Sequence, residues 1–368
     1  MIYNEKKKIE NAIDFYMLAN NLKYIVDINE SIADRIYGAI ILATAINSEY
    51  NITDDLSKVI RTILLSKIYA YNRDEMEEIF NRDHKYAYEV YDYYWAKTLE
   101  GHFAHECVRL ENELVSFFYK FDNGEFDIND YDIVYKLANE QGVFDRIGKN
   151  EKNIEIFRFY YLNRVLKQKV RSGWDSTHWN VSNDRVERIS EHCVGTIALA
   201  IALKSQFGFD VDLDKVISTL CVHEIGEIKI GDITPFDNIT PEQKQEIEHK
   251  AIIEVLGNLS NKDNIIDSIF EFDKRETNEA KFAHYCDKLE ADIQAKVYQD
   301  MGCHHSLDDQ DNNVVFKNAK AQQMVADGAK TAFDIWYEWD KSIYADDEVF
   351  AQMLDFANEH NTQKSDIF

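Results

Sequence analysis

Proline and glycine are scarce in this chain of 368 residues, which contains 2 prolines and 13 glycines. Both residue types interrupt regular backbone. Their scarcity, together with long stretches of helical periodicity, excludes a fold rich in tight turns and predicts an almost entirely α-helical protein. Pro235 and Pro241 fall in one segment, which is therefore the clearest irregular loop. Hydrophobic residues make up 45% of the sequence, enough for a packed core.

Basic residues are too few to balance the acidic ones. The chain has 41 lysines and arginines against 67 aspartates and glutamates, a formal net charge of −26. Such a surface repels polyanions, so we expect no nucleic-acid partner and no binding to anionic membranes. A small anion could still bind in a local basic pocket.

Paired cysteine motifs and long apolar runs are also missing. The five cysteines form no CxxC pair, and we expect buried free thiols in a reducing compartment. No run approaches the roughly 18 apolar residues of a membrane span. Residues Met1 to Lys8 lead into an amphipathic helix without an apolar signal core. We therefore expect a cytoplasmic protein.

Several polar motifs interrupt the apolar helical pattern of the second half. Apolar spacing predicts one helix from Ile189 to Leu203 and another from Leu213 to Ile225. Imidazole and carboxylate groups are costly to bury unpaired, so their presence in such helices indicates a site. A third helical segment adds one more carboxylate. Two imidazoles and two carboxylates suit one divalent metal ion, and the four candidate ligands are His192, His223, Glu224 and Asp287.

The order and spacing of these motifs resemble the HD-domain metal-dependent phosphohydrolases, and within them the branch that contains the 5'-deoxynucleotidases. The resemblance runs from about Leu166 to Val297. One departure is Glu224, where the family has aspartate, so this carboxylate reaches one methylene further. The segments that carry the resemblance are Arg171-Ser172-Gly173-Trp174, Arg188-Ile189-Ser190-Glu191-His192, His223-Glu224-Ile225-Gly226-Glu227, Gly231-Asp232-Ile233-Thr234-Pro235, Ala280-Lys281-Phe282 and Cys286-Asp287-Lys288-Leu289-Glu290.

The resemblance implies an all-α HD-domain helical bundle that hydrolyses nucleoside 5'-monophosphates, in particular deoxynucleoside ones, to nucleoside and phosphate. It implies one divalent ion, for which Co, Mn, Mg, Zn, Fe and Ni are equally compatible with the sequence. Glu227 would position or activate the nucleophile, and Asp232 would help at the scissile group. The alternative for both carboxylates is hydrogen bonding to the histidine ligands.

Positive charge for a phosphate group has to come from a few side chains. By resemblance, Arg171 contacts phosphate and sugar, with Trp174 as the aromatic beside it. A planar guanidinium can bind phosphate through two hydrogen bonds. Arg185 and Arg188 lie nearby in the sequence and are expected to add charge, whereas Lys288 is a weaker candidate.

Two other functions stay open at this point. One keeps the HD site but changes the substrate to a nucleoside triphosphate or a (p)ppGpp-like alarmone. The other is a non-catalytic regulatory protein that binds a metal or a nucleotide. This alternative is favoured by Glu224, which stands where the family has aspartate.

The first half of the chain repeats the second half. The pattern predicts a tandem of HD-like domains, with residues 1–125 as a degenerate copy and residues 126–368 as the phosphohydrolase domain with a C-terminal helical extension. Three pairs of segments correspond in the same order: Phe15–Lys23 with Phe159–Lys167, Gly38–Ala45 with Gly195–Ala202, and Phe103–Glu111 with Phe282–Glu290.

The metal ligands do not repeat, because Arg35, Ser66, Lys67 and Val108 stand where the four candidate ligands stand. The first copy is therefore predicted to bind no metal at this position. We place the boundary in Phe121–Asp127, followed by a connecting helix over Tyr131–Gly142. Related enzymes commonly form homodimers, so we expect either a homodimer or an intramolecular pseudo-dimer.

Some segments occur in the second copy alone. Extra residues fall within Arg171 to Arg188 and between Ile225 and Phe282, and such loops are candidates for substrate handling. The tail from Asn318 to Glu359 has helical periodicity. Its aromatic residues are predicted to pack across a helical interface, with a nucleobase platform as the alternative; they are Phe333, Trp336, Tyr337, Trp339 and Tyr344.

Overall fold

A computed structural model describes residues 2–82, 86–121, 150–234, 236–237, 239–310 and 313–363, together with 132, 135, 136 and 139. Helices dominate these residues, which confirms the predicted all-α class. The described sheet is a short antiparallel pair, β1 (Val26–Asp27) with β2 (Glu30–Ser31).

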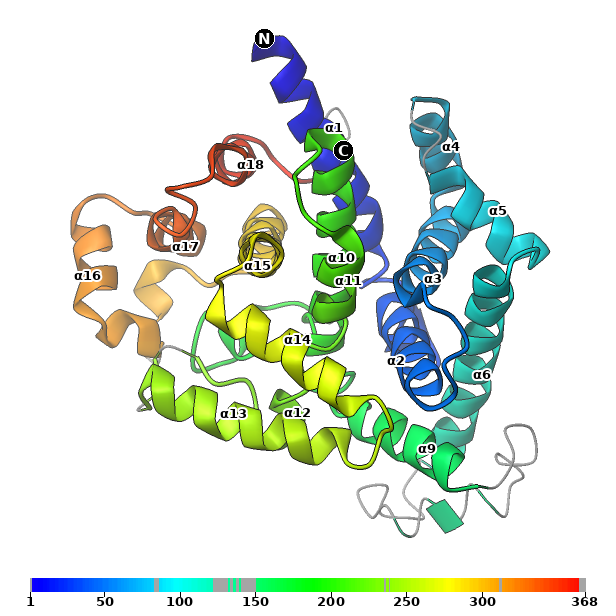
Figure 1. Cartoon of the computed structure of the whole chain (residues 1–368). Helices are drawn as coiled ribbons and strands as arrows, with labels where there is room; N and C mark the ends of the chain where they lie inside the picture. The colour runs from blue at the N-terminus through cyan, green and yellow to red at the C-terminus, as the bar shows by residue number, and fades with distance from the viewer. Residues whose placement is uncertain are drawn as a thin grey trace.

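The described helices of the N-terminal half lie between Ile2 and Phe121 (Figure 1). They are α1 (Ile2–Asn21), α2 (Ile32–Tyr50), α3 (Leu56–Tyr71), α4 (Arg73–Arg82), α5 (Ala87–Trp95) and α6 (Leu99–Phe121).

The C-terminal half carries the predicted motifs. Its elements are α9 (Glu151–Asn163), η2 (Ser172–Trp174), α10 (Ile189–Phe207), α11 (Leu213–Leu220), α12 (Glu227–Ile230), α13 (Pro241–Leu256), α14 (Lys262–Lys274), α15 (Asn278–Asp300), η3 (Leu307–Asp309), η4 (Val314–Lys317), α16 (Ala319–Ala326), α17 (Ala332–Asp340) and α18 (Glu348–Glu359).

Two details of the sequence prediction are corrected. Pro241 does not lie in the loop but occupies the first turn of α13, where its missing N–H costs no helical hydrogen bond. The helix expected to run to Ile225 ends at Leu220. The loop itself is present at residues 231–234, 236–237 and 239–240, while Pro235 lies outside the described residues.

The helices of the two halves pack in matching groups. In the N-terminal half α2, α3 and α6 contact one another, and in the C-terminal half α10, α11 and α15 do the same. Helices α2 and α10 meet between the groups, as do α3 and α11. One hydrophobic cluster contains buried residues from both halves. The duplication stays a prediction, but the matched packing is what it would require.

Helix α1 and helix α9 each pack on the half of the molecule to which they do not belong in sequence. Helix α1 lies along α10, and α9 lies against α2 (Figure 1). Each group is therefore completed by a helix from the other part of the chain. Most of the predicted boundary at Phe121–Asp127, and most of the predicted connecting helix at Tyr131–Gly142, lie outside the described residues, so the division into domains stays a prediction.

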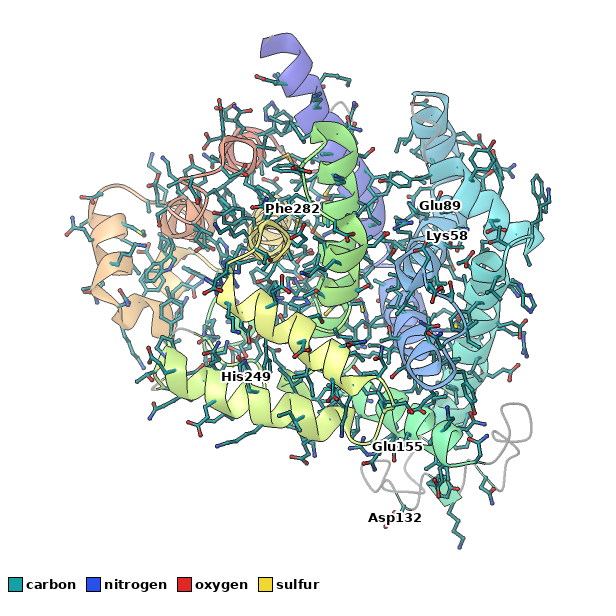
Figure 2. All side chains as sticks on the ribbon, viewed as in Figure 1. Lys58, Glu89, Asp132, Glu155, His249 and Phe282 are labelled. Carbon is teal, nitrogen blue, oxygen red and sulfur yellow. The ribbon has the colours of Figure 1, made fainter. Side chains whose placement is uncertain are left out.

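The predicted C-terminal extension forms three helices, and α17 and α18 pack on α15. Side chains fill the space between these elements, as at Phe282 of α15, whose ring contacts those of Phe209 and Phe350 (Figure 2). All five cysteines are buried free thiols. Among the described helices, none combines the length and apolar character that a membrane crossing requires.

Candidate active site

Four side chains from three segments converge at one point. His192 comes from α10, Asp287 from α15, and His223 and Glu224 from the turn that follows α11. One ligand atom from each lies within 4.8 Å of all the others. His192 Nε2 is 2.9 Å from Asp287 Oδ1, and His223 Nε2 is 3.6 Å from Glu224 Oε1. The structure thus brings together the four residues that the sequence proposed as metal ligands.

The early end of α11 orients His223. Its ring Nδ1 lies 2.9 Å from the carbonyl oxygen of Leu220, the position at which a continuing helix would accept the amide of Glu224. Nδ1–H therefore donates to the backbone, and Nε2 is left with a free lone pair. Nε2 is buried and has no hydrogen-bond partner among the described residues.

His192 is oriented in the same way by a different group. Its Nδ1 lies 2.5 Å from Glu290 Oε2, which turns Nε2 toward the cluster. A histidine that binds metal usually has its second nitrogen held by a carboxylate or a backbone carbonyl. The donor set, the outward Nδ1 contacts and the buried unpartnered Nε2 of His223 all fit a divalent cation.

Negative charge accumulates around these imidazoles. Burial and the charge of Arg171 lower the pKa of His192, but the carboxylates of Glu290 and Asp287 outweigh them and raise it to about 9. Burial likewise opposes ionisation of Asp287, yet the charge of Lys288 and the hydrogen bond of His192 hold its pKa well below the usual value. The negative charge that raises the pKa of His192 would equally favour a divalent cation at the same point.

Three members of the cluster, His223, Glu224 and Asp287, line a cavity of about 750 Å³, whereas His192 is fully buried and does not line it. Other walls are aromatic, basic and acidic, so the cavity can contact rings, phosphate and a metal ion at once. Of the residues predicted for the site, those that line it are Arg171, Trp174, His223, Glu224, Glu227, Asp232 and Asp287.

Arg188 is not brought to this cavity. Its Nη1 binds the carbonyl oxygen of Lys167 at 2.5 Å and Asp34 Oδ2 at 3.2 Å. Arg185 also binds Asp34, at 2.7 Å. Asp34 is a buried carboxylate of α2, and it draws both arginines to the contact between the halves. Their charge is used there rather than on a substrate phosphate.

Arg171 directly precedes the short helix η2 beside the cluster, and Trp174 is the last residue of this helix. Arg171 Nη1 lies 3.9 Å from Glu224 Oε1. Trp174 donates its Nε1–H to Glu187 Oε2 at 2.9 Å. Asp232 fixes the same turn, because its Oδ2 accepts the amide of Ser172 at 2.7 Å. A hydrogen-bonded turn thus presents the guanidinium and the ring to the cavity.

Glu227 begins α12 and is buried in the same wall. Burial, followed by the charges of Glu224 and Asp232, raises the pKa of Glu227 well above its usual value. The ammonium of Lys169 holds the backbone oxygen of Glu227 at 2.9 Å. A carboxyl group that readily carries a proton therefore stands beside the cluster.

The structure adds three residues to the cavity wall that the sequence had indicated as less favoured candidates. Lys288 lines the cavity with its Nζ 3.0 Å from Asp287 Oδ2. Trp336 and Trp339 of α17 also line it, although the tail aromatics were predicted to pack across an interface. Phe333 and Tyr344 do pack against α15, because Phe333 shares a cluster with Tyr298 and the ring of Tyr344 contacts that of Tyr285. The signal was the aromatic composition of the tail, but sequence alone does not tell which rings face a cavity.

Comparisons with known proteins agree with this geometry. The family model described as HD domain matches residues 164–331. The 5'-deoxynucleotidase HDDC2 of Dictyostelium discoideum is 32% identical over 148 residues, which cover 38% of this chain and 76% of that protein. The human 5'-deoxynucleotidase HDDC2 is 28% identical over 148 residues, covering 40% and 69%. The 5'-deoxynucleotidase hdd1 of Schizosaccharomyces pombe is 27% identical over 154 residues, covering 40% and 74%.

Proposed function

The chain belongs to the HD-domain family of metal-dependent phosphohydrolases, and from this premise we propose that it hydrolyses nucleoside 5'-monophosphates, in particular deoxynucleoside ones, to nucleoside and phosphate. One observation carries the proposal: the four-residue cluster, with the buried unpartnered Nε2 of His223, opens into a cavity that has both basic and aromatic walls. The names of the relatives support the choice of substrate.

His192, His223, Glu224 and Asp287 would hold one divalent cation. When bound, such a cation lowers the pKa of a coordinated water and neutralises charge on a phosphoryl oxygen. The longer side chain of Glu224 is compatible with this role, because its Oε1 lies 3.6 Å from His223 Nε2 and 3.7 Å from His192 Nε2.

Two carboxyl groups would handle protons and orientation. Glu227 accepts the proton of the attacking water, as expected for a buried carboxylate beside the cluster. Asp232 lines the cavity and, through the amide of Ser172, keeps the turn with Arg171 in register. We assign it to the scissile phosphate on that basis.

The phosphate needs cations because many carboxylates line the cavity. Arg171 and Lys288 flank the cluster, where Arg171 is near Glu224 and Lys288 near Asp287. A guanidinium can hold two phosphate oxygens and an ammonium a third. A monophosphate at this point would lie between both side chains and the cluster.

The base would pack on the aromatic wall contributed by α17. Trp336 stacks on Trp174 with ring centroids 4.9 Å apart, and Trp339 meets Phe236 edge to face at 5.5 Å. Every nucleobase offers a flat π face, so such a wall favours nucleotides over other phosphomonoesters.

The test is release of orthophosphate from a panel of deoxynucleoside and ribonucleoside monophosphates. The full chain is first dialysed against a chelator and then supplied separately with Co²⁺, Mn²⁺, Mg²⁺, Zn²⁺, Fe²⁺ or Ni²⁺. We expect turnover of deoxynucleoside monophosphates that depends on one or more of these ions. No turnover of any monophosphate with any ion would overturn the proposal.

Two other outcomes identify the alternatives. Release of pyrophosphate or triphosphate from nucleoside triphosphates or alarmones would move the activity to those substrates. Tight nucleotide binding without turnover, unchanged in Glu224→Asp, would indicate a regulatory protein.

A further inference from the structure

A lysine from the N-terminal half lies inside the C-terminal half. Lys23 lies two residues beyond the end of α1, and its side chain is only 3% exposed. Its Nζ lies 2.5 Å from Glu187 Oε1 and 2.6 Å from Glu290 Oε1, two carboxylates that are themselves fully buried. The ring of Tyr16, also from α1, lies under the ammonium at 5.9 Å and donates its hydroxyl to Glu290 Oε1 at 2.8 Å.

Each of these carboxylates has a second contact in the candidate active site. The other oxygen of Glu290 holds Nδ1 of His192. The other oxygen of Glu187 accepts the indole N–H of Trp174. Glu290 therefore links Lys23 to the candidate metal ligand His192, and Glu187 links it to Trp174 in the cavity wall.

Glu187, His192 and Glu290 could by themselves be taken for a second metal site, because their ligand atoms lie within 4.8 Å of one another. The ammonium of Lys23 already stands between the two carboxylates and supplies the cation there. This cluster is thus better described as the support of the first site.

An equivalent lysine lies in the other half without any metal ligand beside it. Lys167 follows α9 and is 2% exposed, and its Nζ contacts Glu111 at 2.7 Å and Glu30 at 2.6 Å. Tyr160 lies under it at 5.7 Å. Here the place of His192 is taken by Arg35, whose Nη2 donates to Asn112 rather than to Glu111.

We propose that Lys23 is a positioning residue of the metal centre. It neutralises Glu187 and Glu290 at once, so that Glu290 fixes His192 and Glu187 fixes Trp174. The N-terminal half then acts as a built-in partner, in the sense of a pseudo-dimer: it binds no metal through the four equivalent positions but holds the ligands of the other half in place. This role rests on the proposed metal site.

The experiment compares Lys23→Met with Lys167→Met in the full chain. Both changes leave two glutamates without their shared ammonium. The two glutamates around Lys23 are fully buried, and of the partners of Lys167, Glu111 is 1% and Glu30 15% exposed. Both variants are therefore expected to have a lower unfolding temperature in the metal-free state. Loss of a group that orients a metal ligand typically weakens metal binding about 10- to 100-fold. We expect that loss for Lys23→Met and a change of less than about two-fold for Lys167→Met.

Metal affinity is measured by calorimetric titration of the chelator-treated chain with Mn²⁺ or Co²⁺, and by the rise in unfolding temperature that each ion produces. Equal weakening in both variants, or no weakening in Lys23→Met, would overturn the proposal. These readouts need no turnover, so they remain valid even if the chain hydrolyses no monophosphate.

A second variant covers the case in which Lys23→Met does not fold. Lys23→Met with Glu187→Gln removes one positive and one negative charge together, so the buried charge stays balanced. We expect recovered folding but a metal affinity still about 10-fold below wild type, because the ammonium is missing from Glu290. Full recovery of metal affinity along with folding would show that Lys23 acts on stability alone.

Discussion

The two halves of this protein share a buried framework and differ at the positions that could carry chemistry. Both place a lysine against two glutamates, and both place a tyrosine under that lysine. The C-terminal half adds two imidazoles and two carboxylates beside this framework. In the N-terminal half, the predicted repeat puts Arg35, Ser66, Lys67 and Val108 at the corresponding positions. The framework is thus separable from the site it supports.

The largest difference in activity between matched variants of the two halves should appear when the imidazole of His223 is removed. His223→Ala takes away one of the four proposed ligands, so phosphate release should fall by more than the about 10- to 100-fold that follows loss of a ligand's hydrogen-bond partner. The matched change is Ser66→Ala, at the equivalent position, which removes a hydroxyl bonded to the backbone of Ile63. Initial rates for both variants test this, and a comparable loss in Ser66→Ala would contradict the division of labour.

A smaller effect is expected where each half brings a glutamate against a glycine. A Cβ added at Gly195 would overlap the carboxylate of Glu290, and one added at Gly38 would overlap that of Glu111. Both alanine variants should lose about 1–3 kcal/mol of stability through overpacking. Gly195→Ala alone should also weaken metal binding, because Glu290 is displaced from His192. Denaturant unfolding and metal titration separate the two effects, and equal metal affinities would argue against the link.

The aromatic residues of the halves offer a third comparison. Trp339 lines the cavity, whereas Trp95 of α5 is 62% exposed. Trp339→Ala should raise KM roughly 10-fold, equivalent to about 1.4 kcal/mol, within the range of base–aromatic stacking. Its kcat should change less. Trp95→Ala should leave both parameters unchanged, and steady-state kinetics on one deoxynucleoside monophosphate would show a failure of either expectation.

The smallest effect concerns a carboxyl pair that the C-terminal extension forms with α15. Burial raises the pKa of Asp292 and of Asp340, and the neighbouring charge of Asp340 raises that of Asp292 further. A carboxyl whose folded pKa is raised stabilises the fold at low pH, and this stability is lost as pH rises through the raised value.

Asp340→Asn cannot ionise and should escape that loss. Its unfolding temperature relative to wild type should be higher at pH 8 than at pH 5.5, by about a few degrees. Asp74→Asn, at an exposed position of α4, should follow the pH dependence of wild type. A constant difference between Asp340→Asn and wild type at the two pH values would refute the pair's role.

Local pattern was enough to predict the helices and the four side chains that the structure brings together. Apolar spacing marked α10 and α15, and the polar residues within them were His192 and Asp287. The predicted end of α11 was wrong. The apolar pattern would continue this helix, but a hydrogen bond from the side chain of His223 to the Leu220 carbonyl stops it. Such competition between side chain and backbone does not appear in periodicity.

Long-range charge pairing explains the other differences. Arg188 was expected near phosphate, but Asp34, far away in the sequence, binds it. The role of Lys23 was also not foreseen, although Lys23 and Lys167 ended the first pair of repeated segments. A lysine kept at equivalent places in two apolar segments is a signal that such a residue has buried partners.

The packing of α1 on α10 and of α9 on α2 has a consequence for any deletion in the chain. A half without the four candidate ligands would ordinarily be dispensable for the metal site. Here its helix α1 covers α10. The loop after α1 carries Lys23, whose ammonium binds Glu290, the carboxylate that holds His192. A deletion of the N-terminal half would also remove this helix and this ammonium from the candidate active site, so we expect the two halves to be retained together.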